Sequence, residues 1–242
     1  SNKQTHLSIF LKAKSLEQEG KKIIHMEVGE PDFLPPIIVK NELNEVFDKG
    51  FVKYGQARGM PVFRDVLAKY VSEKFNTNVT QENIIVSPGA RFSIFTAITT
   101  LLNPGDEMIV IEPAWPAYKD CALNAGIKVR TINTTLEQKW EPSIEQIKNA
   151  INTNTKMIVL NYPNNPTGKI LPEKLQDEII KLAKENQLYV LSDEIYSQYA
   201  KSNWKSVLSY NYEKSVITQS FSKSHAMTGF RVGYGIADTK II

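Results

Sequence analysis

The sequence has 242 residues, of which 42% are hydrophobic and 23% charged, which is ordinary for a globular protein with a buried core. Its net charge of +3 is small for this length, and no apolar run approaches the ~18 residues that span a bilayer, so neither nucleic acid nor a membrane is expected as a partner. The single cysteine, Cys121, excludes an intrachain disulfide and a metal site of several thiolates, and it favours a reducing, cytoplasmic location.

Two helical segments are predicted near the N-terminus. An amphipathic pattern covers residues 8–19, and a second helix is predicted over residues 36–49. A turn-rich stretch, residues 29–33, lies between them. We therefore assign residues 1–47 to an N-terminal arm and part of a small domain, and residues 48–242 to a large domain.

Strands and helices alternate from residue 84 onward. Seven short apolar runs have the length and flanking turns of buried strands; they cover residues 84–87, 107–111, 127–132, 156–160, 188–192, 215–219 and 232–236. Helical periodicity covers residues 90–102, 117–125, 143–151 and 172–185. This alternation predicts an α/β fold with a mainly parallel, mixed seven-stranded sheet and helices on both faces. In such sheets the chemistry lies beyond the carboxyl ends of the strands.

Lys223 directly follows the sixth predicted strand, within Ser220-Phe221-Ser222-Lys223. Desolvation or a nearby cation lowers the pKa of a lysine toward the neutral amine that attacks an aldehyde. Two serine hydroxyls and the nearby Arg231 can hold a phosphate. Taken alone, the segment fits a solvated lysine after a strand better than a reactive one.

Asp193 follows the fifth predicted strand, with Tyr196 just beyond it. A carboxylate at a strand's carboxyl end can pair with a protonated pyridine nitrogen and keep that ring an electron sink. Tyr196 can reach the same ring from a turn. A helix N-cap is the commoner role for such an aspartate, so this motif also does not decide alone.

Two turns add weaker signals. The segment 161–168 contains two prolines and a glycine, which make a stiff turn whose side-chain amide can donate to a ring oxygen; a plain connecting loop is the alternative. The segment 87–91 joins a strand to a helix, and free N–H groups at a helix start suit a phosphate.

Together these motifs resemble the fold-type I pyridoxal-phosphate family, specifically the class I/II, aspartate aminotransferase-like enzymes. The matching motifs run along nearly the whole chain in the family's order: Gly29-Glu30-Pro31-Asp32, Tyr54-Gly55 with Gly59, Pro88-Gly89-Ala90, Glu112-Pro113-Ala114-Trp115-Pro116, Asn165-Pro166-Thr167-Gly168, Asp193-Glu194-Ile195-Tyr196, and Ser222-Lys223 through Arg231. The resemblance implies that residues 48–242 form the cofactor-binding large domain. Family members continue beyond the position of Ile242, so we expect the C-terminal part of the fold, with its carboxylate-binding arginine, to be absent.

The resemblance also implies residue roles. Lys223 would form a Schiff base with pyridoxal 5'-phosphate and shuttle a proton, while Asp193 would pair with the pyridine nitrogen. Trp115 would stack on the ring, and Asn165 and Tyr196 would hydrogen-bond its hydroxyl oxygen. The phosphate would be bound by Gly89, Ala90, Arg91, Ser220, Ser222 and Arg231, and by Tyr54 of the neighbouring subunit in a homodimer. Substrate contacts are expected from Gly29, Trp115 and Asn165. Glu112–Pro113 and Asn165–Pro166 are candidate cis bonds.

The activity implied is transfer of an amino group from an α-amino acid to a 2-oxo acid. One alternative keeps the cofactor but changes the reaction, to that of a carbon–sulfur lyase or a related eliminating enzyme. An alternative of another class is a non-catalytic binding module with this fold. The sequence does not specify the amino acid.

Overall fold

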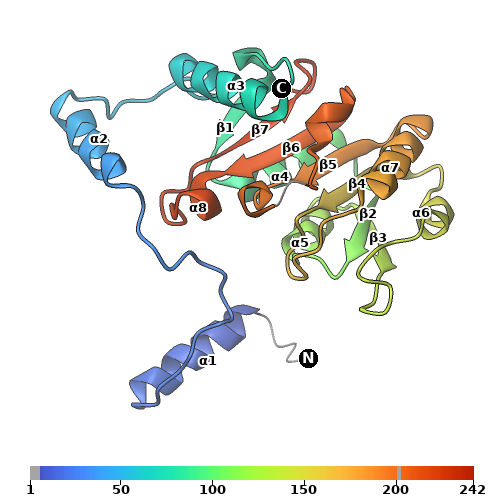
Figure 1. The fold of residues 1–242 in the computed structure, drawn as a ribbon, viewed down its shortest axis with the longest axis horizontal. Coiled ribbons are helices and arrows are strands. Elements are labelled where there is room, and N and C mark those ends of the chain that lie inside the picture. The colour runs from blue at the N-terminus through green and yellow to red at the C-terminus, as the bar shows by residue number, and fades with distance from the viewer. Residues whose placement is uncertain (1–5, 201–202) are drawn as a thin grey trace. The chain divides into compact units, whose positions relative to one another are not determined.

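The computed structural model describes residues 6–200 and 203–242 (Figure 1). Contacts divide the chain into two compact units, Ser1–Leu34 and Pro35–Ile242. The first unit contains helix α1 (His6–Gln18), and the second begins with α2 (Ile37–Asp48). Both helices were predicted, whereas the domain boundary after residue 47 stays a prediction.

A seven-stranded sheet of order β1-β7-β6-β5-β4-β2-β3 forms the centre of the second unit (Figure 1). Its strands are β1 (Ile84–Ser87), β2 (Glu107–Glu112), β3 (Lys128–Asn133), β4 (Thr155–Asn161), β5 (Tyr189–Asp193), β6 (Ser215–Ser220) and β7 (Gly233–Ala237). β7 runs antiparallel to both of its neighbours, β1 and β6, and every other neighbouring pair is parallel. The predicted mixed, mainly parallel sheet is confirmed, and each strand overlaps the run predicted for it.

Helices cover both faces of this sheet because side chains along a buried strand point alternately to opposite faces. On β2, Ile109 and Ile111 belong to one core cluster, while Met108 and Val110 belong to the other. The first cluster includes residues of α3 (Pro61–Phe75), α6 (Ile144–Ala150) and α7 (Glu173–Glu185). The second includes residues of α4 (Ala90–Leu101) and α5 (Ala117–Asn124).

Helix α3 is the long helix that sequence patterning did not predict. It begins at Pro61, which suits a first helical position because that residue needs no N–H partner. Arg64 occupies a core-facing position in it, 5% exposed, and donates hydrogen bonds to the carbonyls of Gly59 (3.2 Å) and Gln81 (2.9 Å). A charged residue at a buried position interrupts the apolar stripe from which such helices are recognised.

The strand directions bring several carboxyl ends to one edge of the sheet. β1 and β6 are both antiparallel to β7, so they are parallel to each other and end at the edge where β7 begins. Along this edge Asn161 pairs with Asp193, and Asp193 pairs with Thr218. Gly233 pairs with both Ser220 and Ser87. Among the helices described, none is long and apolar enough to cross a membrane.

Candidate active site

Most of the predicted site residues lie at this carboxyl edge. Asp193 ends β5, and Lys223 lies in the short helix α8 (Phe221–Ser224), which follows β6 directly. The residues that the strand ends bring to this edge are Gly89, Ala90, Arg91, Trp115, Asn165, Asp193, Tyr196, Ser220, Ser222, Lys223 and Arg231. Gly29 belongs to the Ser1–Leu34 unit, and Tyr54 precedes α3 with its side chain fully exposed. The roles predicted for those two residues stay predictions.

Asp193 is 3% exposed, and three donors surround its carboxylate. The Tyr118 hydroxyl donates to Oδ2 at 2.6 Å. Oδ1 accepts from the Thr218 hydroxyl and from the backbone N–H of Ile195, both at 3.3 Å. Burial raises the pKa of Asp193, while these hydrogen bonds act in the opposite direction by stabilising the ionised form. A cation beside this carboxylate would therefore be strongly favoured.

Tyr118 connects Asp193 to a second aromatic residue of the site. Its ring lies edge-on to that of Trp115, with centroids 5.5 Å apart. The Arg91 guanidinium lies 5.6 Å from the centroid of the Trp115 ring. Burial, and then the charge of Asp193, raises the pKa of Tyr118 well above its usual value, so the hydroxyl keeps its proton and remains a donor. Sequence reasoning missed Tyr118, which lies on α5, just after Trp115, and belongs to none of the recognised motifs.

The stiff loop after β4 is fixed to Asp193 and to the loop after β2. The Asn161 side chain donates to the Asp193 carbonyl at 3.2 Å and accepts from the Asn165 N–H at 2.9 Å. Asn164, which is buried, donates to the Pro113 carbonyl at 3.3 Å. The Asn161 side chain thus links the backbone of Asn165 to that of Asp193. Neither Asn161 nor Asn164 was among the predicted site residues.

Three proline peptide bonds near the site are cis. Glu112–Pro113 and Asn165–Pro166 were predicted to be cis and are confirmed. Tyr162–Pro163 is a third, which the sequence analysis did not identify.

The loop before α4 forms a cup that suits an anion. Gly89 caps the helix with φ +82°, and Ala90 and Arg91 provide first-turn N–H groups, which have no partner within a helix. The φ of Gly89 favours glycine, and a Cβ there would lie 2.5 Å from Nη2 of Arg231 and would displace the end of that side chain. Arg91 and Arg231 also line a cavity of about 320 Å³ beside Pro88.

Ser220 and Arg231 are fixed by backbone contacts next to this cup. The Ser220 hydroxyl accepts from the Ser222 N–H at 3.0 Å and lies 3.0 Å from the Val232 carbonyl oxygen. Arg231 donates through Nη1 to the Thr228 carbonyl at 2.8 Å. Hydroxyls, a guanidinium and helix N–H groups are the donors that phosphate oxygens accept.

Lys223 and Tyr196 lie on neighbouring segments and are both partly buried. The Tyr199 hydroxyl donates to the backbone carbonyl of Lys223 at 2.7 Å, which ties α8 to the turn that follows Asp193. Burial, and then the charge of Asp193, raises the pKa of Tyr196. The Tyr196 hydroxyl therefore stays protonated at neutral pH and can donate a hydrogen bond.

Comparison with known families identifies this arrangement. The model of the family "Aminotransferase class I and II" matches residues 21–242. The chain belongs to this family. The resemblance inferred from the motifs is therefore confirmed.

Several aminotransferases are similar over almost the whole chain. The aspartate aminotransferase of Thermotoga maritima is 36% identical over 238 residues, which cover 97% of this chain and 63% of that protein. The aspartate aminotransferase of Sulfolobus acidocaldarius is 35% identical over 240 residues, covering 95% and 59% of the two chains. The crystal structure of the Thermotoga maritima enzyme superposes with a TM-score of 0.95 at 34% identity, covering 99% of this chain and 65% of that one. The chain thus spans less than two thirds of the length of these relatives.

Aminotransferases of this family use pyridoxal 5'-phosphate, and the site's donor set fits that cofactor. The anion cup at Gly89–Arg91 matches a phosphate in charge. Burial is the largest influence on the pKa of Asp193, and a protonated pyridine nitrogen is a cation that would offset it. Lys223 follows the strand adjacent to that of Asp193, so an amine and a carboxylate are available at the same edge.

Proposed function

We propose that the protein carrying this chain is a pyridoxal-phosphate-dependent aminotransferase, which transfers the amino group of an α-amino acid to a 2-oxo acid. The observation that carries the proposal is the buried, braced carboxylate of Asp193 beside the strand that leads to Lys223. When bound, the cofactor supplies an electron sink for the charge left after α-proton removal. Side chains and backbone groups of this chain would supply positioning and proton transfer.

The roles proposed for these side chains follow from their chemistry. Lys223 binds the cofactor covalently through Nζ and carries the proton that leaves the substrate's α-carbon. Asp193 holds positive charge at the ring nitrogen, which stabilises the transition state electrostatically. Trp115 packs on the ring face.

Hydrogen bonds and phosphate contacts complete the assignment. Asn165 and Tyr196 donate to the ring's hydroxyl oxygen. The phosphate is bound by residues around the start of α4 and the end of β6: Gly89, Ala90, Arg91, Ser220, Ser222 and Arg231. Gly29, Trp115 and Asn165 are proposed as substrate contacts.

The proposal also covers the amino donor, the oligomeric state and the location of the protein. Aspartate is the first amino donor to test, because several similar proteins are named aspartate aminotransferases. A homodimer is proposed because the fully exposed Tyr54 side chain is available to a neighbouring subunit's phosphate. A cytoplasmic location remains part of the same proposal.

The test is a single-turnover assay of the protein loaded with cofactor. Mixing with aspartate should convert the cofactor to its aminated form and release oxaloacetate in equal amount. Addition of 2-oxoglutarate should then restore the original spectrum. In the same assay with cysteine, whose β-carbon carries a sulfur leaving group, release of sulfide, ammonia and pyruvate would instead identify an eliminating enzyme. Failure of every amino acid tried to aminate the cofactor would contradict transamination.

A further inference from the structure

Glu194, the residue after Asp193, has a buried carboxylate that the proposed chemistry does not use. It is 1% exposed, and its backbone N–H donates to the Thr218 carbonyl at 3.0 Å, which extends the pairing of β5 with β6. Adjacent side chains on an extended segment point to opposite faces of the sheet. Asp193 contacts α5 through Tyr118, and Glu194 contacts the segment 206–207 instead.

Three donors bind the Glu194 carboxylate. Ser206 donates its hydroxyl to Oε2 at 2.7 Å, and the Val207 backbone N–H donates to Oε1 at 2.8 Å. Ser192, on β5 itself, donates its hydroxyl to Oε1 at 3.0 Å. A buried carboxylate in the middle of such donors is costly to remove, because each donor would be left without a partner.

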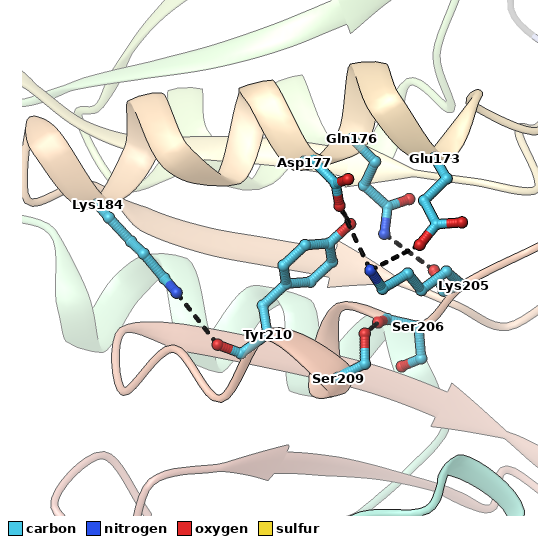
Figure 2. Close-up of polar contacts among 8 residues, drawn as sticks. All are labelled: Glu173, Gln176, Asp177, Lys184, Lys205, Ser206, Ser209 and Tyr210. Atoms are coloured by element: carbon cyan, nitrogen blue, oxygen red, sulfur yellow. Dashed lines mark hydrogen bonds and ion pairs between the residues drawn. The ribbon is translucent and has the colours of Figure 1, made fainter.

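The segment that holds Glu194 is itself fastened to α7 (Figure 2). Lys205 Nζ lies 2.9 Å from Glu173 Oε1 and 3.3 Å from Asp177 Oδ1, and it lies over the Tyr210 ring at 4.4 Å. The Tyr210 hydroxyl donates to Asp177 at 2.6 Å, and Gln176 donates to the Lys205 carbonyl at 2.9 Å. Figure 2 shows these side chains pointing toward one another between the helix and the segment.

We infer that Glu194 is a positioning residue for Asp193: it anchors the end of β5 to the segment 203–210, and through that segment to α7. The inference rests on the proposed function, since the group to be positioned is the carboxylate that faces the cofactor's ring nitrogen. Tyr118 and Thr218 fix the Asp193 side chain by donating hydrogen bonds to its carboxylate. Glu194 fixes the backbone next to Asp193 by binding the segment 206–207 on the other face of the sheet.

The test compares Glu194→Ala, Glu194→Gln and Ser206→Ala with the control Ser209→Ala. Ser209 lies in the same segment but donates to the Ser206 carbonyl, at 2.8 Å, and not to Glu194. Each purified protein is loaded with pyridoxal 5'-phosphate labelled with ¹⁵N in the ring. The ring nitrogen's chemical shift and the dissociation constant of the cofactor are then measured.

We expect Glu194→Ala to weaken cofactor binding roughly tenfold and to shift the ring nitrogen toward its unprotonated value. Ser206→Ala should change the affinity and the nitrogen shift in the same direction, but by less. If Glu194→Ala does not fold, the result for Ser206→Ala decides the test. Glu194→Gln should be close to wild type, because its amide oxygen can accept from Val207 and Ser192 while its NH2 donates to the Ser206 hydroxyl. Ser209→Ala should match wild type. If both Glu194→Ala and Ser206→Ala keep the wild-type nitrogen shift and cofactor affinity, this inference is wrong, while the proposed function still stands. Wild-type protein that binds no cofactor would overturn the proposed function, and this inference with it.

Discussion

The Tyr118 hydroxyl donates a 2.6 Å hydrogen bond to Oδ2 of Asp193, between residues on α5 and β5 that are both buried. The same tyrosine ring contacts Trp115. One side chain therefore sets two parts of the proposed site, the carboxylate for the ring nitrogen and the indole for the ring face. The first prediction concerns this contact.

Tyr118→Phe should weaken cofactor binding by roughly tenfold to a hundredfold, because a hydrogen bond to a charged group contributes about 1.5–3 kcal/mol. The phenylalanine ring keeps the packing against Trp115, while Asp193 loses its shortest donor and its pKa rises further. Equilibrium dialysis of the cofactor measures the effect. Tyr212→Phe is the control, because that hydroxyl donates to the Leu188 carbonyl at 2.8 Å, away from Asp193. Equal affinities in both variants would contradict the role of Tyr118.

Asp193→Asn should lower the rate of amino transfer by on the order of a hundredfold or more, since the amide cannot balance positive charge on the ring nitrogen. The shape of the side chain is retained, so the fold should persist. Stopped-flow measurement of the first half-reaction, with circular dichroism as a check of folding, gives the result. A rate within a few-fold of wild type would argue against a charge role for Asp193.

Gly89→Ala should weaken phosphate binding and destabilise the fold. The φ of +82° is unfavourable for alanine, and the new methyl group would meet Arg231 at 2.5 Å. Gly105→Ala is the matched control, because φ is +97° but no atom lies within 4 Å of the added carbon. Both variants should lose about 1 kcal/mol or more of stability in urea unfolding. A loss of cofactor affinity is expected only for Gly89→Ala, and an equal loss in both would refute the cup assignment.

Glu194 should make stability depend on pH. Burial is the largest cause that raises its pKa, from 4.5 to about 7, and the neighbouring charge of Asp193 adds to the rise. Between these pH values the folded state keeps a proton that the unfolded state releases, so the free energy of unfolding falls as pH rises. The expected loss is about 3 kcal/mol in total, and it levels off above the folded-state pKa.

Urea unfolding of wild type and Glu194→Gln at about pH 5 and pH 8 measures this dependence. Glutamine cannot ionise, so the variant should lose most of the fall in stability across the interval. The same fall in both proteins would assign the pH dependence to other groups.

Much of the fold could be predicted because its strands are short, apolar and bounded by turns. Side chains of a buried strand alternate between the two faces of the sheet, as Met108 and Ile109 on β2 show by packing into opposite core clusters. Helix α3 was not predicted this way, because buried Arg64 interrupts its apolar stripe and donates to the carbonyls of Gly59 and Gln81, which lie outside the helix. A charged residue in a sequence predicts an exposed position unless the groups that bind it in the folded protein are known.

The site was predictable where a motif carries its own chemistry, as at Lys223 and Asp193. Residues that act by holding others were not. Tyr118 is 75 positions from Asp193 in sequence, and nothing in the segment around it indicates that contact. Glu194 lies within a recognised motif, yet its partner Ser206 becomes visible only when the segment after β5 folds back onto α7.

The most direct test of the account is to locate the bond between protein and cofactor. The protein loaded with pyridoxal 5'-phosphate is reduced with borohydride, digested and mapped by mass spectrometry, alongside Lys223→Ala. The account predicts a single labelled lysine, Lys223, and loss of both the label and the yellow absorption band in the variant. A label on another lysine, or a band that persists unchanged in Lys223→Ala, would contradict it.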